Sequence, residues 1–487
     1  MKNSGMGWRL YNDRAKIAAQ FGILAALLCL WVVMPAAAQY TQPPASAASQ
    51  TPGSTSAGEN DQLKPTYPGE PLNKPPVEAK IGPVALRVYG TVLLNISLSD
   101  SDEVGQDIPL WPFPSSTPIT LSDGTVRRAG SIHDTIFTAR QSVFGVVLNP
   151  ATPSDNGWNT SALVEMDFFG VRPADTNLPE DRVLNQPRLR KAYFQLQKGH
   201  FKLVAGQDDI IISPLNPVSL SHVAVPLGYT NGNLFGWLPQ VRADISHDWG
   251  KTSALFQIGV LRPAFGDPHL GDVPASGVSI DSSSGLGERA SQPFYQSRMA
   301  ISHPMHGSPL TLGVAGHYGQ ERIGAARTID SWAFTFDYRI PIFSKLFLRG
   351  EGYLGSNLVP FGGGIVQGVA AVAAPPPAPA NTFNLFHKIG DGGGWSELTF
   401  IATQRNIFYL GYTEDDPVHH ELLPGTTKSR NAMAWFSYFR KLTPGTTIAV
   451  EYSNWLFQTT GFTGNVPSTR GAGGRGNVLN IALAYQF

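Results

Sequence analysis

The sequence predicts an all-β protein: a 16-stranded antiparallel transmembrane β-barrel with long external loops and short periplasmic turns. Three observations predict this fold. Residues 476–487 alternate, with apolar side chains from Leu479 to Phe487 on one parity and small or polar ones on the other, which is the period of a β-strand. Sixteen such stretches occur along the chain. The segments that join them are alternately short and long, as in barrels of bacterial outer membranes.

Composition narrows the class of protein. Of the 487 residues, 15% are charged, against roughly a quarter in ordinary soluble domains. The formal net charge is zero, so nothing indicates nucleic acid as a partner. After the leader described next, no run of about 20 apolar residues occurs that could form a membrane-spanning helix.

The first 80 residues contain two segments that we expect to lie outside the barrel. Basic residues between Lys2 and Lys16 precede an apolar run, and small residues end at Ala38. Residues 1–38 are therefore predicted to be a signal peptide; an uncleaved anchor is the alternative. The sole cysteine, Cys29, lies in this leader, so the mature chain is expected to have no disulfide or thiolate site. Residues 39–80 are rich in Pro, Ser and Ala and are predicted to be a disordered periplasmic linker, with cell-wall contact as the alternative.

Residues 81–487 are predicted to form the barrel. Four tryptophans on the lipid-facing parity predict two interfacial girdles, with Trp158 and Trp249 at the periplasmic ends of strands and Trp237 and Trp332 at the external ends. The predicted strands cover residues 84–97, 136–148, 160–169, 188–197, 201–207, 238–247, 252–261, 294–303, 310–319, 331–340, 346–354, 395–403, 406–413, 431–439, 446–455 and 476–487.

Charged residues in these strands fall mainly on the parity opposite the apolar one. A cation that faces lipid at mid-bilayer costs about 2–4 kcal/mol, so this parity should face a water-filled lumen. Lys191 and Tyr193 share the outward parity of Leu189. The candidate pore-lining residues are Arg140, Glu165, Asp167, Arg188, Arg190, Arg242 and Asp244.

Two interpretations of these charges remain open, and they can hold together. In the first, the charges pair across strands and stabilise the barrel wall. In the second, the loop of residues 208–236 folds inward opposite the arginines and forms a constriction. A basic wall that faces acidic residues of such a loop would create a transverse electric field that orients ions.

Four motifs between residues 84 and 247 resemble those of the DcaP-like porins. The resemblance implies a trimer that admits small, often dicarboxylic, acids, and it matches Arg188 and Arg190 to pore-lining arginines. The sequence departs from the family at Lys191, where a histidine is usual, at Asp208-Asp209, and in its Pro-rich rather than helical periplasmic segment. The motifs are Glu165-Met166-Asp167-Phe168-Phe169-Gly170, Arg188-Leu189-Arg190-Lys191-Ala192-Tyr193, Gly206-Gln207 and Pro239-Gln240-Val241-Arg242.

Other motifs do not support a second chemistry. The glycine-rich pattern from Gly471 to Gly476 matches a dinucleotide-binding fingerprint, but it lies in a predicted loop rather than between a strand and a helix. His419 and His420 lack a third predicted metal ligand. We therefore expect no catalytic residues, no cofactor and no metal site.

These observations predict an outer-membrane porin that lets small hydrophilic solutes diffuse passively, with a weak preference for anions. The expected partners are membrane lipids, these solutes and two further copies of the chain in a homotrimer, and nucleic acid is not expected. The alternative is an outer-membrane barrel with an enzymatic or a structural and adhesive role. A plugged transporter would need about 22 strands and a folded plug, for which residues 39–80 are too few.

Overall fold

The computed structural model describes residues 77–487 except for 106, 122, 131–132, 151–154, 171–184, 266–284, 324–326, 374–382, 423–426, 464–465 and 469–470. The predicted leader (1–38) and residues 39–76 of the predicted linker lie outside the described residues. Among the helices of the described part, none has the length and apolarity needed to cross a bilayer.

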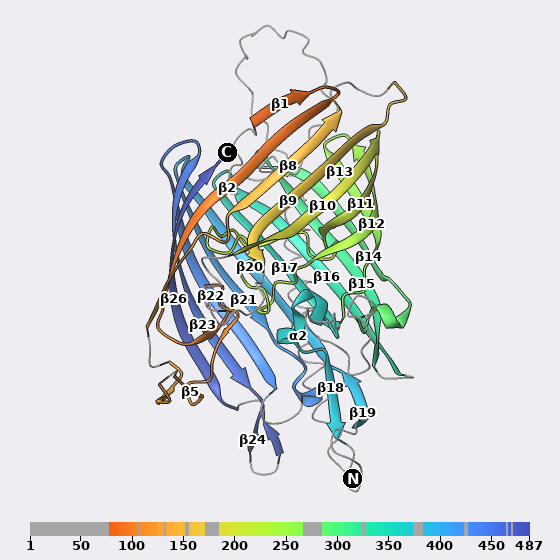
Figure 1. The fold of residues 1–487 in the computed structure, drawn as a ribbon. Helices are drawn as coiled ribbons and strands as arrows, with labels where there is room; N and C mark the ends of the chain where they lie inside the picture. The colour runs from red at the N-terminus through yellow and green to blue at the C-terminus, as the bar shows by residue number, and fades with distance from the viewer. Residues whose placement is uncertain are drawn as a thin grey trace, which may run out of the picture. The chain divides into compact units, whose positions relative to one another are not determined.

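One antiparallel sheet of eighteen strands makes up the wall, and it closes because β2 (Val84–Ser99) pairs with β26 (Gly473–Gln486) (Figure 1). Two strands, β7 (Asp134–Thr138) and β8 (Val143–Pro150), are halves of one wall strand, and β1 (Val77–Ile81) lies beside β2 beyond the end of β26. The closed ring therefore has sixteen strands, which confirms the predicted fold class.

Each of the sixteen predicted ranges overlaps one wall strand. The other wall strands are β9 (Asn159–Gly170), β10 (Gln186–Lys198), β11 (Phe201–Asp209), β12 (Trp237–Trp249), β13 (Thr252–Leu261), β14 (Phe294–Met305), β15 (Ser308–Ile323), β16 (Arg327–Phe343), β17 (Leu346–Ser356), β20 (Gly390–Thr403), β21 (Asn406–Asp415), β22 (Lys428–Lys441) and β23 (Thr446–Thr459).

Most connections at one end of the barrel are short turns, and most connections at the other end are longer. Five turns have two residues each, at 199–200, 250–251, 306–307, 344–345 and 404–405. By the rule for bacterial barrels the loop end lies outside the cell. The connections at that end carry the short elements β3 (Glu103–Val104), β4 (Trp111–Pro112), β5 (Pro118–Thr120), β6 (Val126–Arg128), η3 (Glu288–Ala290), η4 (Val359–Phe361), α2 (Gly363–Val366), β18 (Val369–Ala373), β19 (Phe383–Lys388), η5 (His419–Glu421), β24 (Gly461–Thr463) and β25 (Val466–Ser468).

The strand β1 corrects the predicted end of the linker. Residues 77–80, predicted to be disordered, pair with β2 in the register Val77↔Val88 to Ile81↔Val84. The chain turns back between β1 and β2 over two residues, of which Gly82 has a φ of 59° that favours glycine. The hairpin supplies hydrogen-bond partners to the part of β2 that lies beyond the Gly90–Phe487 hydrogen bonds.

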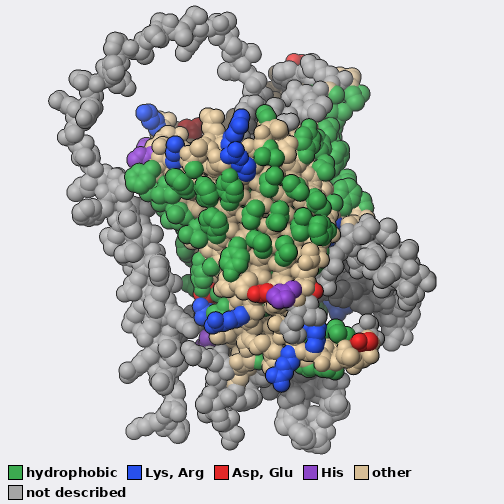
Figure 2. All heavy atoms as spheres, turned by 90° about the vertical axis from the view of Figure 1, so that its left-hand side faces the viewer, with side chains coloured by type: hydrophobic (Ala, Val, Ile, Leu, Met, Phe, Trp, Pro, Cys, Tyr) green, Lys and Arg blue, Asp and Glu red, His purple; other side chains and the backbone are tan. Residues whose placement is uncertain are grey.

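The outer and inner faces of the wall differ in polarity and in exposure. Outward side chains such as Leu483, Val450 and Phe334 are apolar and exposed, whereas their inward neighbours are buried. Figure 2 shows the apolar side chains gathered in a band, with charged side chains above and below it. Of the predicted girdle, Trp249 and Trp332 are exposed large side chains on this outer face. A lipid bilayer is the environment that such a band matches.

The apolar band generates a prediction for β26. Ile481 lies between Asn477 and Tyr485 on the outward face and pairs with Val450 and Ile96, so it is near the middle of the band. The substitution Ile481→Arg should lower the free energy of unfolding by about 2–4 kcal/mol.

The matched control is Asn454→Arg, because Asn454 is exposed on the same face beside Asn477 at the band's edge, where an arginine should cost at most about 1 kcal/mol. Denaturant titration in lipid vesicles measures both. Equal losses for the two variants would contradict the assignment of this face to lipid.

Candidate pore site

The connection between β11 and β12, residues 210–236 and hereafter the inward loop, lies inside the barrel. None of its residues is exposed. It touches inward side chains of strands far around the ring, including Gln296 of β14 and Glu451 of β23. The structure thus places this loop in the lumen, as the constriction hypothesis required. The acids of the predicted loop 208–236 are Asp208 and Asp209, which lie at the end of β11 and pair with Lys191 and Arg242. The inward part, residues 210–236, carries no Asp or Glu.

Buried carboxylates of the wall accept hydrogen bonds from the backbone of the inward loop. Glu351 of β17 accepts from Leu215 N at 2.6 Å and from the Ser213 hydroxyl. Glu397 of β20 accepts from Val218 N at 3.0 Å. The backbone of this segment has no adjacent strand, so these side chains supply the partners that its buried N–H groups require.

An interruption of the second wall strand supplies another anchor. Residues 139–142, between β7 and β8, do not pair with β2. The Leu93 N–H of β2 has no backbone partner there and donates instead to the Ser142 hydroxyl. In this break Gln141 is fully buried. Its Oε1 accepts from Val223 N at 2.9 Å and from Ala224 N at 3.2 Å, while its Nε2 donates to the carbonyl of Ser221. One glutamine therefore holds the middle of the inward loop.

Arginines of the wall satisfy carbonyl groups of the same segment. Arg188 Nη2 donates to Ala224 O at 2.6 Å, and Arg190 Nη1 donates to Val223 O at 2.8 Å. Arg349 donates to the carbonyl of Asn216. The loop is thus fixed by carboxylates that accept from its N–H groups and by arginines that donate to its carbonyl groups.

Apolar contacts add to these polar anchors. Val218 and Leu220 belong to a buried cluster with Leu93, Tyr409 and Phe439. In a second cluster Leu215 and Leu227 pack with tryptophans of β20, β22 and β23. The burial of such side chains contributes roughly 1.5–3 kcal/mol each. The inward loop is therefore a packed part of the barrel interior.

Arginine and aromatic side chains alternate beside the middle of this loop. The guanidinium carbon of Arg140 lies 3.8 Å from the ring centre of Phe169, and Arg188 lies 5.2 Å from the same ring. Trp237 follows, 5.2 Å from Arg188 and 4.6 Å from Arg190. The prediction that Trp237 faces lipid is wrong, because its ring stacks on arginines that bond the inward loop. We call these five residues the arginine stack.

The three arginines of the stack also form ion pairs. Arg188 and Arg190 pair with Asp167 and Glu165 on the adjacent strand β9 at 2.7 Å each. Arg140 pairs with Asp107, which comes from the connection between β2 and β7. Five of the predicted pore-lining residues are therefore brought together here.

The other two predicted residues belong to a neighbouring ion network. Arg242 bonds Asp244 at 3.0 Å and Asp208 at 3.1 Å, and Lys191 extends this network through Asp208. Lys202 pairs with Asp244 at 3.1 Å. Arg242 and Asp244 are both buried, so their first role is to pair with each other inside the wall.

The outward placement of Lys191 and Tyr193 is wrong. A register shift between Leu189 and Lys191 in the pairing of β10 with β9 marks a β-bulge, and this bulge reverses the alternation of side chains. Tyr193 is 5% exposed and packs in an inner cluster with Tyr89. A β-bulge of one residue cannot be detected from the alternation of apolar and polar residues in the sequence.

Accessibility is unequal within four of these ion pairs. The carboxylate side chains are 0–4% exposed, whereas their cationic partners are 16–31% exposed. Asp209, which also bonds Lys191, departs from this pattern at 43%, and Glu165 and Arg190 are about equally covered. The pairs therefore present mainly cationic edges to water. They are Arg140–Asp107, Arg188–Asp167, Lys191–Asp208 and Lys202–Asp244.

The connection between β2 and β7, residues 100–133 and hereafter the outer loop, contacts the arginine stack through Asp107 and the strands β22 and β23 through other residues. Asn431 Nδ2 donates to Leu110 O at 2.7 Å, and Trp111 stacks on Phe457 with ring centres 6.0 Å apart. Sequence patterns did not identify Asp107 as a site residue, because an aspartate in a long loop carries no periodicity.

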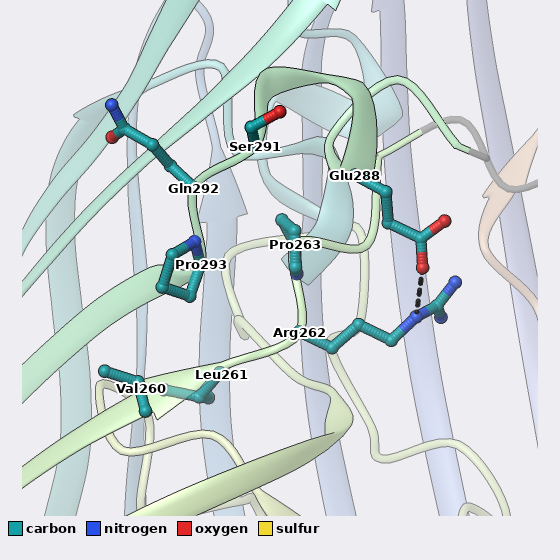
Figure 3. A pocket seen from close by; sticks show the side chains of 8 residues that line it. All are labelled: Val260, Leu261, Arg262, Pro263, Glu288, Ser291, Gln292 and Pro293. Atoms are coloured by element: carbon teal, nitrogen blue, oxygen red, sulfur yellow. Dashed lines mark hydrogen bonds and ion pairs between the residues drawn. The ribbon is translucent and has the colours of Figure 1, made fainter.

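A separate crevice occurs at the loop end of β13, with a volume of about 370 Å³. Figure 3 shows that Val260, Pro263 and Pro293 line it, with the Arg262–Glu288 ion pair at 3.0 Å on one side. None of its lining residues belongs to the arginine stack. Within the described residues, no three His, Cys, Asp or Glu side chains are grouped so that they could hold a metal ion.

The closed ring of sixteen strands with an apolar outer band defines the class of protein: a β-barrel of the bacterial outer membrane. No known family and no curated protein matches the sequence. Within this class the fold is similar to that of the outer membrane channel DcaP of Acinetobacter baumannii, with a TM-score of 0.59 and 13% identity over 85% of this chain and 100% of that one.

A second solved structure has a related fold. The anion-selective porin from Comamonas acidovorans matches with a TM-score of 0.50 and 12% identity, over 83% of this chain and 100% of that one. At these identities the likeness concerns the fold. It agrees with the resemblance to DcaP-like porins that the motifs of β9 to β12 indicated.

The outer loop generates a pH prediction. Burial raises the pKa of Glu103 to about 7, although the hydroxyls of Ser99 and Ser101 donate to it and oppose the shift, and Asp100 and Asp134 add to it. An acid whose pKa is raised in the folded state binds a proton that the unfolded state releases. The stability of the docked loop should therefore fall as the pH rises from about 4.5 to about 7 and should stay level above.

Hydrogen exchange of the outer-loop amides, corrected for the intrinsic effect of pH, measures this change. The variant Glu103→Gln lacks the titrating group and should lose the slope. A wild-type slope equal to that of the variant would show that another group is responsible.

Proposed function

We propose that this protein is an outer-membrane porin through which small hydrophilic solutes diffuse passively, with a weak preference for anions that include small carboxylic acids. The observation that carries the anion preference is the unequal accessibility of the ion pairs beside the inward loop. Because their carboxylates are occluded and their guanidinium and ammonium groups are more exposed, a solute meets hydrogen-bond donors and positive charge first.

The arrangement of the arginine stack supports the same proposal. The rings of Phe169 and Trp237 hold Arg140, Arg188 and Arg190 in a row, so their guanidinium groups need little reordering when an anion approaches. The planar fork of a guanidinium suits the two oxygens of a carboxylate. We infer that Arg140, Arg188 and Arg190 line the solute path, and that Glu165, Asp167, Arg242 and Asp244 act mainly by pairing.

Several further features of the proposal rest on less direct support. The apolar band supports contact with membrane lipids. The homotrimer is proposed from the resemblance to DcaP-like porins. The signal peptide and the linker are proposed from composition, with the linker ending before Val77.

Arg188 is the most exposed of the three arginines of the stack, at 30% of its side chain. We expect Arg188→Gln to reduce the anion-to-cation permeability ratio by roughly two- to fivefold, because the Coulomb attraction to an ion at 4 Å is about 1 kcal/mol in water. The reversal potential of single channels in a planar bilayer under a salt gradient measures the ratio.

Arg440→Gln is the matched control, since Arg440 is exposed on the outer face near the turn end. Its reversal potential should equal that of the wild type. If correctly folded protein opens no channels, transport itself is contradicted and the enzymatic or adhesive alternative gains support.

The inward loop generates a prediction for conductance. The Ser213 hydroxyl oxygen lies 2.5 Å from Leu234 O, so the two arms of the loop lie side by side at its base. Deleting residues 214–232 joins Ser213 to Asn233 across this short gap and removes most of the chain from the lumen. Single-channel conductance should rise, and an unchanged conductance would contradict the role of the loop as a constriction.

A further inference from the structure

Asp107 differs from the other carboxylates that pair with the arginine stack. Asp167 and Glu165 belong to the wall strand β9, whereas Asp107 is part of the outer loop. Its side chain is 0% exposed, although it lies in a connection at the mouth of the barrel. The carboxylate of Asp107 thus extends from the outer loop into the site that the wall arginines form.

The contact between Asp107 and Arg140 is bidentate. Arg140 Nε donates to Asp107 Oδ2 at 2.9 Å, and Arg140 Nη2 donates to Oδ1. The face of the same guanidinium lies on Phe169 at 3.8 Å. Two parallel hydrogen bonds to one carboxylate are the strongest arrangement that an arginine makes. They use the edge of Arg140 that a dissolved carboxylate would also use.

The outer loop makes further contacts with the wall and with the inward loop, for example between Asp100 and Asn477 and between Leu110 and Thr230. Leu110 and Trp111 contact β22 and β23. Ser115 N donates to Gly473 O at 3.0 Å. A second ion pair, between Asp102 and Arg127, lies within the loop itself. The Asp107–Arg140 pair, in contrast, joins this loop to the arginine stack.

We propose that Asp107 is a tethered counter-ion that occupies Arg140 in place of a solute carboxylate, and that it thereby sets how strongly the channel selects and retains carboxylate solutes. The inference deepens the proposed function and rests on it. A solute that carries a carboxylate exchanges with Asp107 at Arg140, one bidentate ion pair replacing another. This exchange makes and breaks no covalent bond.

Two substitutions that break the same ion pair give opposite results under this proposal. Asp107→Asn frees the guanidinium of Arg140, so the reversal potential in a potassium chloride gradient should move toward that of chloride. With succinate as the probe, the concentration that halves the channel current should fall about tenfold. Arg140→Gln removes the cation and leaves Asp107, so anion selectivity and succinate block should both fall below those of the wild type.

The control is Asp102→Asn, which breaks the ion pair to Arg127 inside the same loop but leaves the arginine stack intact. It should behave as the wild type in both assays. If Asp107→Asn and Arg140→Gln change selectivity in the same direction, or if Asp102→Asn reproduces Asp107→Asn, the effect is loosening of the loop and the proposal is overturned.

The same recordings separate this inference from the proposed function. A wild-type channel that is closed or prefers cations contradicts the proposed function. An anion-preferring wild type whose selectivity and succinate block are unchanged by Asp107→Asn contradicts only the role of Asp107. Heat-dependent migration of the folded barrel on a gel, checked for every variant, shows that the recordings come from folded protein.

Discussion

A chain segment inside a barrel has no neighbouring strand, and its buried backbone groups must still be hydrogen-bonded. The inward loop meets this constraint through side chains of the wall. Glu351 and Glu397 receive its N–H groups, Arg188 and Arg190 donate to its carbonyls, and Gln141 does both. Charged side chains, which the lipid face excludes, thus hold the inward loop in place inside the barrel.

The same constraint shapes the electrostatics of the lumen. Most of the carboxylates that accept from the loop backbone or from the inward arginines are buried, whereas Glu165 is about as exposed as Arg190. An arginine is long and has five donors, so Arg188 binds Asp167 and the carbonyl of Ala224 and still keeps part of its surface exposed. Although the sequence has equal numbers of acids and bases, four ion pairs of the described part expose more of the cation than of the carboxylate.

The sequence predicted the wall better than its contents. A charged side chain that faces lipid is destabilising at any position along a wall strand. The sequence pattern therefore predicts where the strands lie and that Arg188 and Asp167 face inward. Lys191 was assigned to the wrong face, because one extra residue in a bulge reverses the alternation of side chains without changing composition. The prediction for Trp237 was wrong because an aromatic residue at the end of a strand can face either lipid or a guanidinium group inside the barrel. Asp107 and the anchors of the inward loop depend on contacts between segments far apart in sequence, for which a periodic pattern contains no information.

The hairpin of β1 and β2 bears on how the barrel closes. Thr91 pairs with Gln486 across almost the whole chain, whereas β1 pairs with β2 through a two-residue turn, and local contacts of this kind form early. Once β1 is in place, the backbone of β2 up to Val88 has its partners, and the incoming last strand stops with Phe487 bonded to Gly90. A slip of one residue would turn the apolar face of β26 inward. The short strand β1 therefore occupies the edge of β2 next to Phe487, where a shift of β26 along β2 toward the turn end would meet it.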